Sequence, residues 1–171
     1  MIQEERFFAR HIGKSVLLDS NLLLVFLAGS FDPRLFGSFK RISGYTLDDY
    51  DLLVRLLSFF KTLLTTPHIL TEVSNLANSL PERSKTGWSR SFAALLQTQQ
   101  KTPGLREQWT PATELSKMPE FKAFGITDAA LTNLSLDALV VTEDYRLSGV
   151  LQSRGIHVLN FGDLRKLQQL F

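Results

Sequence analysis

Four acidic residues stand close to points where apolar runs of the chain begin or end. Asp19 and Asp144 come just after short apolar runs, and Glu72 and Asp128 fall early in segments with helical spacing. Carboxylates that meet at one place repel each other and raise each other's pKa values unless a cation lies between them. Oxygen ligands without cysteine suit Mg²⁺ or Mn²⁺. Such a site lowers the pKa of a bound water and stabilises charge on a phosphoryl group, so the four acids predict phosphodiester chemistry.

The elements that must position these acids alternate between strands and helices. Short runs of leucine and β-branched residues that stop at polar turns are typical of strands buried on both faces. They predict strands at 15–19, 63–66, 138–142 and 155–160. Apolar residues three and four apart predict helices at 21–28, 46–61, 67–80, 82–101, 126–134, 145–153 and 162–171. This alternation indicates an α/β fold with a parallel sheet and right-handed crossovers.

The order of the elements brings three of the acids to one edge of this sheet. Asp19 and Asp144 close the first and third predicted strands, and Glu72 lies on the helix that leaves the second strand at the same edge. In open α/β sheets, ligands bind outside the carboxyl ends of the strands. Asp128 precedes the third strand, on a helix whose place the order of elements does not fix.

Four segments carry these acids in the order of a known nuclease family. They are Val16-Leu-Leu-Asp19-Ser-Asn21, Thr66-Pro-His-Ile-Leu-Thr-Glu72-Val, Gly125-Ile-Thr-Asp128-Ala-Ala and Leu139-Val-Val-Thr142-Glu-Asp144. Together they resemble the four motifs of PIN-domain nucleases, over about residues 14 to 162. The resemblance implies one PIN-like domain over 1–171, a three-layer α/β/α sandwich around a parallel sheet of four or five strands, with an inserted segment at about 29–46. It also implies Mg²⁺- or Mn²⁺-dependent cleavage of RNA.

The resemblance assigns roles by position. Asp19, Glu72, Asp128 and Asp144 would be the catalytic, metal-binding acids. Asn21 and Thr142 would support the site through hydrogen bonds, as groups behind metal ligands do. The resemblance further implies the toxin of a toxin–antitoxin pair, with an antitoxin protein as partner. Separately, the apolar C-terminal pair Leu170-Phe171 could dock on the chain's own core or on a second copy of the chain.

Two features depart from the family's pattern. Tyr145 and Arg146 follow Asp144, where many members place a further acid, and the chain is longer than the compact VapC-like toxins. The first departure motivates an alternative function, a catalytically inactive PIN-like module that binds RNA or protein. A phosphatase of another doubly wound fold is a weaker alternative, because Asn21 stands where haloacid-type chemistry needs a second aspartate.

A basic stretch could hold the nucleic acid. Arg83, Lys85 and Arg90 surround Trp88, a combination that can bind a phosphate backbone and stack a base, and Arg146 is a further candidate. A solvated helix with one packed tryptophan explains the same stretch equally well.

Helix capping is the simplest alternative explanation for two of the acids. Ser20 or Asn21 can cap the helix after the first strand, and Asp19 and Asp144 are themselves candidate caps. Each acid alone is explained as well by a structural role. The four together favour the metal site.

Other ionisable residues are not assigned to the site. Asp48, Asp49 and Asp51 fall at the start of a predicted helix, where the macrodipole favours anions. Glu143 alternates with Asp144 on an extended segment, so we expect it to face solvent. Of the three histidines, only the one at position 68, four residues before the second acid, invites a further role.

Composition excludes several classes of protein. The chain has 171 residues, 44% of them apolar, enough for one domain with a real core. It has no cysteine, which excludes disulfides and thiolate metal sites. The net charge of +2 permits nucleic-acid binding without indicating it. The N-terminus does not resemble a signal peptide, and no apolar run approaches the ~20 residues of a membrane span, so we expect a cytoplasmic protein without a membrane partner.

Overall fold

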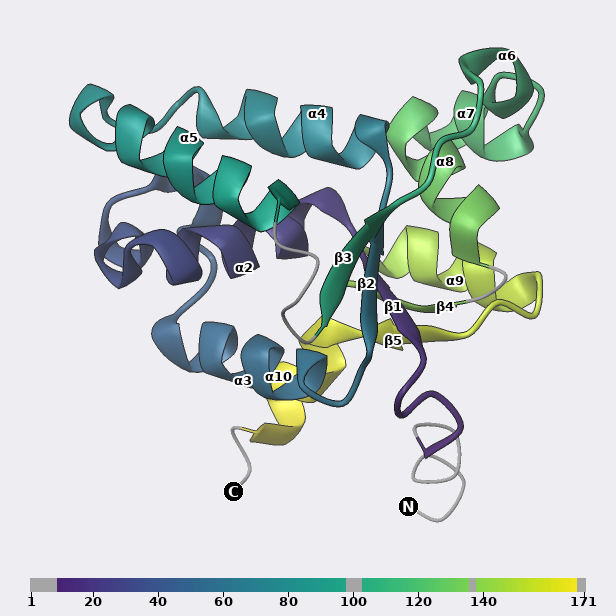
Figure 1. Ribbon diagram of the computed structural model, residues 1–171. Helices are drawn as coiled ribbons and strands as arrows, with labels where there is room; N and C mark the ends of the chain where they lie inside the picture. The colour runs from purple at the N-terminus through teal and green to yellow at the C-terminus, as the bar shows by residue number, and fades with distance from the viewer. Residues whose placement is uncertain (1–8, 98–102, 136–137, 169–171) are drawn as a thin grey trace.

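The sheet is parallel throughout and has five strands in the part of the chain that the structure describes. A computed structural model describes residues 9–97, 103–135 and 138–168. The strands are β1 (Ser15–Leu18), β2 (Thr62–Thr65), β3 (Gly104–Glu107), β4 (Ala138–Thr142) and β5 (Val158–Asn160). Their order is β3-β2-β1-β4-β5, and each neighbouring pair is parallel (Figure 1). The predicted α/β class with a parallel sheet is confirmed.

Helices cover both faces of this sheet and form the outer layers of a three-layer sandwich. The α-helices are α2 (Ser20–Phe31), α3 (Leu47–Leu57), α4 (Pro67–Ala77), α5 (Glu82–Gln97), α6 (Ala112–Leu115), α7 (Pro119–Phe124), α8 (Ile126–Leu134), α9 (Tyr145–Ser153) and α10 (Phe161–Gln168). Figure 1 shows α2, α4 and α5 on one side of the sheet and α8 and α9 on the other. Two opposite layers are what right-handed crossovers produce when the strand order reverses direction.

The core is centred on β1, β4 and α2. Every residue of β4 is buried, and α2 is apolar on nearly all sides. A helix without a polar face has to be covered on all sides. It packs against the sheet, against α4 and α5, and against α3.

The structure differs from the sequence prediction in the edge strand β3. The sequence predicts no strand between its helices at 82–101 and 126–134, yet Gly104–Glu107 pairs with β2, with Thr62 opposite Gly104 and Thr65 opposite Glu107. An edge strand that is partly exposed needs no apolar run, so periodicity does not reveal it. The last strand, expected at 155–160, is shorter and begins at Val158.

The predicted insertion at about 29–46 begins inside a helix. Gly29 does not end α2, which continues to Phe31. Two short 3₁₀ helices follow, η1 (Pro33–Gly37) and η2 (Lys40–Ile42), and the segment buries Leu35, Phe39 and Ile42 in the main core. The inserted segment is therefore ordered and packs against the core.

Gly29 is required by packing. A Cβ at this position would lie 2.2 Å from the Tyr50 ring, closer than any real contact. We expect Gly29→Ala to lower the free energy of unfolding by about 1–3 kcal/mol, because the ring must move. Urea denaturation measures the change.

A matched control for this substitution is Gly149→Ala, in the middle of α9. No heavy atom lies within 4 Å of a Cβ there, so alanine should raise stability by about 0.5–1 kcal/mol through its helix propensity. Equal effects at the two glycines would contradict the packing argument.

Candidate functional site

The site lies where the strand order reverses. The chain leaves β1 toward β2 on one side, whereas β4 leads to β5 on the other side of β1. The connections after β1 and β4 therefore diverge, and ligands of doubly wound folds bind in the crevice between such strand ends. Asp19 follows β1 directly, and Thr142 is the last residue of β4.

Asp19 is buried and firmly held. The residue is only 7% exposed. Its carboxylate accepts hydrogen bonds from the Leu22 N–H (2.8 Å), from the Thr142 hydroxyl (2.5 Å) and from the Glu143 N–H. Burial raises the pKa of Asp19, and the three hydrogen bonds oppose that rise because they favour the charged form. The carboxylate thus has a fixed orientation at the crevice.

The cap of α2 is Asp19 itself. The predicted caps Ser20 and Asn21 are therefore wrong, because both belong to the helix that Asp19 opens. Asn21 is exposed, and no hydrogen bond joins it to the acids among the described residues. Ser20 instead donates from its hydroxyl to the Glu72 carboxylate at 2.9 Å. Sequence reasoning missed this role, for which the local signal was a serine directly after the first acid.

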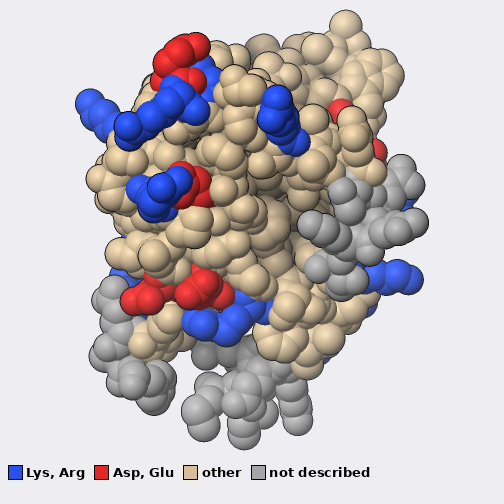
Figure 2. Space-filling model, turned by 60° about the vertical axis from the view of Figure 1, so that its left-hand side comes forward, with Lys and Arg blue, Asp and Glu red and all other residues tan. Residues whose placement is uncertain are grey.

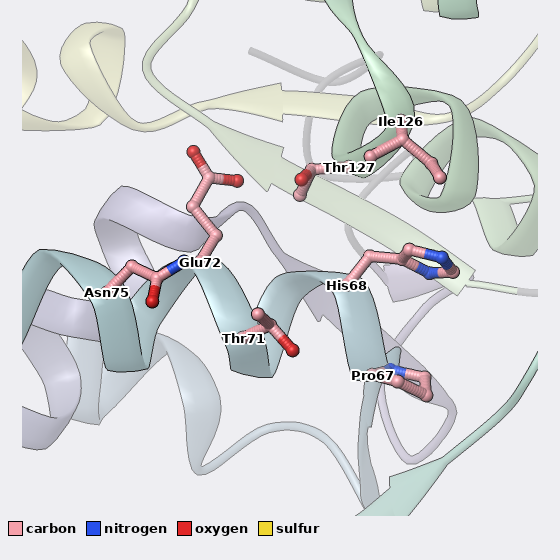
Figure 3. Close-up of a pocket in the computed structure, with 7 residues that line it drawn as sticks. All are labelled: Pro67, His68, Thr71, Glu72, Asn75, Ile126 and Thr127. Carbon is pink, nitrogen blue, oxygen red and sulfur yellow. The ribbon is translucent and has the colours of Figure 1, made fainter. Parts of the chain in front are cut away.

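Glu72 belongs to α4 and borders a pocket. The pocket measures about 490 Å³ and lies between the start of α4 and the start of α8. It is lined by Pro67, His68, Thr71, Glu72, Asn75, Ile126 and Thr127. In Figure 3 the carboxylate extends from α4 into the space beside Thr127. Glu72 is therefore within reach of both the crevice and the pocket.

The pKa of Asp128 shows that the four acids lie close enough to repel one another. It lies in the first turn of α8, which packs against α4. Its pKa is raised from 3.8 to about 7, first by burial and then by the negative charges of Asp19, Glu72 and Asp144. The structure thus brings all four acids into one electrostatic neighbourhood, including the one whose place the order of elements left open.

Asp144 is exposed and caps α9. One of its carboxylate oxygens accepts from the N–H groups of Arg146 (2.7 Å) and Leu147 (3.0 Å). Its own N–H donates to the Thr142 hydroxyl at 3.1 Å. That hydroxyl therefore contacts both Asp144 and Asp19, and it joins the two acids that follow β4 and β1.

The acids fit Mg²⁺ or Mn²⁺ by donor type, although they do not form a closed cage. Among the described residues, no three His, Cys, Asp or Glu side chains are arranged to hold a metal ion. Mg²⁺ in phosphoryl-transfer sites is usually held by one or two carboxylates, with waters and substrate phosphates completing the shell. The raised pKa of Asp128 marks a place where a cation would relieve repulsion.

A second ionic cluster borders the site. The prediction that Glu143 faces solvent is wrong, because it is partly buried and accepts from Arg165 Nη1 at 2.7 Å. The same guanidinium donates to both Asp49 carboxylate oxygens (2.7 and 3.0 Å) and to the Gly44 carbonyl (2.9 Å). It also lies 5.2 Å from the centre of the Tyr45 ring. Arg165 therefore ties α10 to α3, to the inserted segment and to the residue after β4.

The basic residues of α5 begin far from the acids. Arg83 lines another cavity together with Phe31 and Asp32, at the far end of α2 from Asp19. A helix of this length spans about 18 Å. Figure 2 shows lysine and arginine side chains beside aspartate and glutamate on this face, without a continuous basic stripe. The structure thus does not bring Arg83 to the acids.

The other candidate RNA contacts differ in their surroundings. Lys85 pairs with Glu82 at 2.8 Å near the start of α5, and Arg90 is exposed on the same helix. Of the four candidates, only Arg146 adjoins the acids. Its N–H donates to the Asp144 carboxylate, and its guanidinium lies 5.4 Å from the centre of the Phe124 ring.

Comparisons with known proteins add no role to these residues. No family model matches the sequence, and no curated protein matches it. Over the described ranges, no helix is both long and apolar enough to pass through a bilayer.

Replacing Asp128 tests the convergence of the acids. The folded protein keeps the Asp128 proton up to about pH 7, whereas the unfolded chain loses it near the ordinary value of 3.8. Stability from this group is therefore complete below pH 4 and lost as the pH rises to 7. We expect Asp128→Asn to raise the free energy of unfolding by about 1–2 kcal/mol at pH 8, after allowance for solvent screening, and hardly at all at pH 4.

Urea denaturation of the wild type and variant at the two pH values measures this difference. Asp48→Asn is the control, because Asp48 is an exposed acid in the first turn of α3. It should slightly lower stability at pH 8 through the helix dipole. A gain for Asp128→Asn of the same size at both pH values would contradict the convergence.

Replacing Arg165 tests the second cluster. Arg165→Ala leaves the buried Asp49 and the partly buried Glu143 without their cation, so we expect the free energy of unfolding to fall by about 2–4 kcal/mol. Arg165→Lys should recover less than half of it, because an ammonium cannot form the two-pronged contact with Asp49. Thermal and urea unfolding report both losses. Lys166→Ala, at a neighbouring exposed position, should change stability by less than about 0.5 kcal/mol.

Proposed function

We propose that this chain is a metal-dependent nuclease that hydrolyses RNA phosphodiesters at the crevice between the ends of β1 and β4. The observation that carries the proposal is Asp128, whose pKa is raised to about 7 by burial and by Asp19, Glu72 and Asp144. An anionic phosphodiester would be repelled by these acids alone. A cation between the acids and the phosphate would relieve the repulsion among the acids and the repulsion between the acids and the phosphate.

The residues that would hold the cation have oxygens available for it. Both Asp19 carboxylate oxygens accept hydrogen bonds, and its three donors (Leu22, Thr142 and Glu143) leave one of about four lone pairs for a cation. Asp144 uses only one oxygen for its cap, which leaves its second oxygen for another partner. Glu72 likewise accepts from Ser20 through one oxygen. When bound, the ion would activate a water and stabilise negative charge on the phosphoryl group.

The surrounding residues act by positioning. The Thr142 hydroxyl fixes the orientation of Asp19, and the Ser20 hydroxyl fixes that of Glu72. Such outer contacts preserve a ligand's geometry and are usually worth 10- to 100-fold in metal affinity or activity. A cation would also lower the pKa of Asp128, so metal binding should release protons near neutral pH.

Two observations favour a second candidate function, a binding module without turnover. Asp19 and Asp144 both cap helices, and the described part of the chain lacks a ready group of three metal ligands. A module of this kind would bind RNA or protein in the presence of EDTA. The toxin–antitoxin setting stays a prediction, because it rests on the resemblance of the four motifs alone.

Substitution of the two strand-end acids tests the nuclease. We expect Asp19→Asn and Asp144→Asn to reduce Mn²⁺-dependent RNA cleavage by more than about 100-fold, because each removes a charged ligand. Asparagine is a good helix cap, so both variants should still fold. Asp51→Asn, at an exposed acid on α3, is the control and should cleave like the wild type.

Calorimetry with Mn²⁺ supplies the second readout. Binding should weaken in both strand-end variants and stay unchanged in Asp51→Asn. Cleavage that survives both Asp19→Asn and Asp144→Asn would rule out this site as the source of the activity.

A further inference from the structure

The pocket beside Glu72 has features that holding a cation would not require. Its walls are the Pro67 ring, the Ile126 side chain and the His68 imidazole, and its polar edge includes Asn75. Figure 3 shows α4 and the start of α8 facing each other across this space. At about 490 Å³ it is far larger than a hydrated ion needs and can hold a nucleoside-sized group.

An exposed tryptophan lies at the same edge of the sheet. Trp109 is 71% exposed, more than any other exposed large apolar side chain in the described part of the chain. The Gln108 N–H donates to the Thr65 carbonyl at 2.9 Å, which extends the β2–β3 pairing by one residue. Neighbouring strands are about 4.8 Å apart. The backbone of Trp109 therefore lies beside the segment where β2 passes into α4 at Pro67, one of the residues that line the pocket.

The backbone that carries Trp109 is anchored on both sides. Gln108 is bonded to Thr65, and the Thr110 hydroxyl accepts from the Asn133 amide on α8 at 2.9 Å. The indole thus projects into solvent from a segment that two other elements hold in place. Exposing so large an apolar ring gives up burial free energy, and tryptophan in such a place is typical of a binding surface.

The chemistry of these groups selects a flat ligand with polar edges. Indole and imidazole faces stack on aromatic rings, and the Pro67 ring and the aliphatic Ile126 side chain provide apolar walls. The Asn75 amide presents both a donor and an acceptor. A nucleobase meets all of these requirements, and the bases of a duplex do not, because their faces are already stacked.

We propose that Trp109 and the pocket next to Glu72 bind one unstacked nucleobase of a single-stranded nucleic acid. The choice of nucleic acid as ligand rests on the proposed nuclease function. The phosphate attached to that base would then lie at the acids, of which Glu72 is the nearest to the pocket. Arg146, whose guanidinium lies over Phe124 two residues before Ile126, is placed to contact the backbone.

Binding without metal separates this proposal from catalysis. The probe is a fluorescein-labelled ten-nucleotide single-stranded RNA, and its anisotropy is measured in EDTA so that no metal-dependent cleavage occurs. We expect Trp109→Ala to raise Kd about 5- to 100-fold, the range that loss of one stacked base implies. Trp109→Phe should recover most of the affinity. Phe121→Ala, at an exposed aromatic on α7, is the matched control and should bind like the wild type.

Two further probes test the ligand class. Replacing single nucleotides by abasic ones should weaken binding to the wild type at one position, and should weaken binding to Trp109→Ala less at that position because the stacking contact is already lost. Asn75→Ala should change which base is preferred there. The proposal is overturned if Trp109→Ala binds the single strand as the wild type does, or if a blunt duplex RNA binds with the same dependence on Trp109.

The outcome also distinguishes this proposal from the nuclease. Base binding together with absent cleavage would remove the proposed function and leave a nucleobase-binding module. Cleavage that depends on Asp19 but not on Trp109 would remove only the base pocket.

Discussion

The contact between the Thr142 hydroxyl and the Asp19 carboxylate joins the two strand ends on which the site depends. The residues are 123 positions apart in sequence, yet both lie at the carboxyl edge of adjacent strands. The hydroxyl also accepts from the Asp144 N–H, so one side chain fixes the turn after β4 relative to the start of α2. Because both partners are buried, the hydrogen bond cannot be exchanged for one to water without loss of free energy.

The ionic groups around this contact fall into two sets, one in which an arginine compensates the acids and one in which the acids have no basic partner among the described residues. Glu143 and Asp49 share Arg165, whose guanidinium compensates both charges. Asp19, Glu72, Asp128 and Asp144 form no salt bridge with a lysine or arginine in the described ranges, and their charges act on one another. Arg165 therefore stabilises the surroundings of the site while the four acids keep a local excess of negative charge. Repulsion among the four acids lowers the free energy of unfolding, so their proximity is not explained by stability.

The buried strands and the acids at their ends could be predicted from sequence, because apolar runs and the residues that follow them are local patterns. The runs before Asp19 and Asp144 are apolar because β1 and β4 are buried, and their order alone placed both acids at one edge. The strand β3 escaped prediction because an edge strand needs little apolar character. Arg165 escaped it because its partners lie 22 to 121 residues away, and no local pattern encodes such a contact. Trp109 became a candidate only once β3 placed it beside the start of α4.

Helix capping and metal binding are compatible at this site, and together they suggest what the substrate contributes. Asp19 and Asp144 cap α2 and α9, whose N-termini carry partial positive charge. That charge lowers the attraction of the acids for a free cation, which agrees with the absence of a closed ligand group among the described residues. The same N-termini attract a phosphate. A phosphodiester that brings its own oxygens to the cation would therefore complete the shell, and a base held near Glu72 would fix which phosphate arrives there.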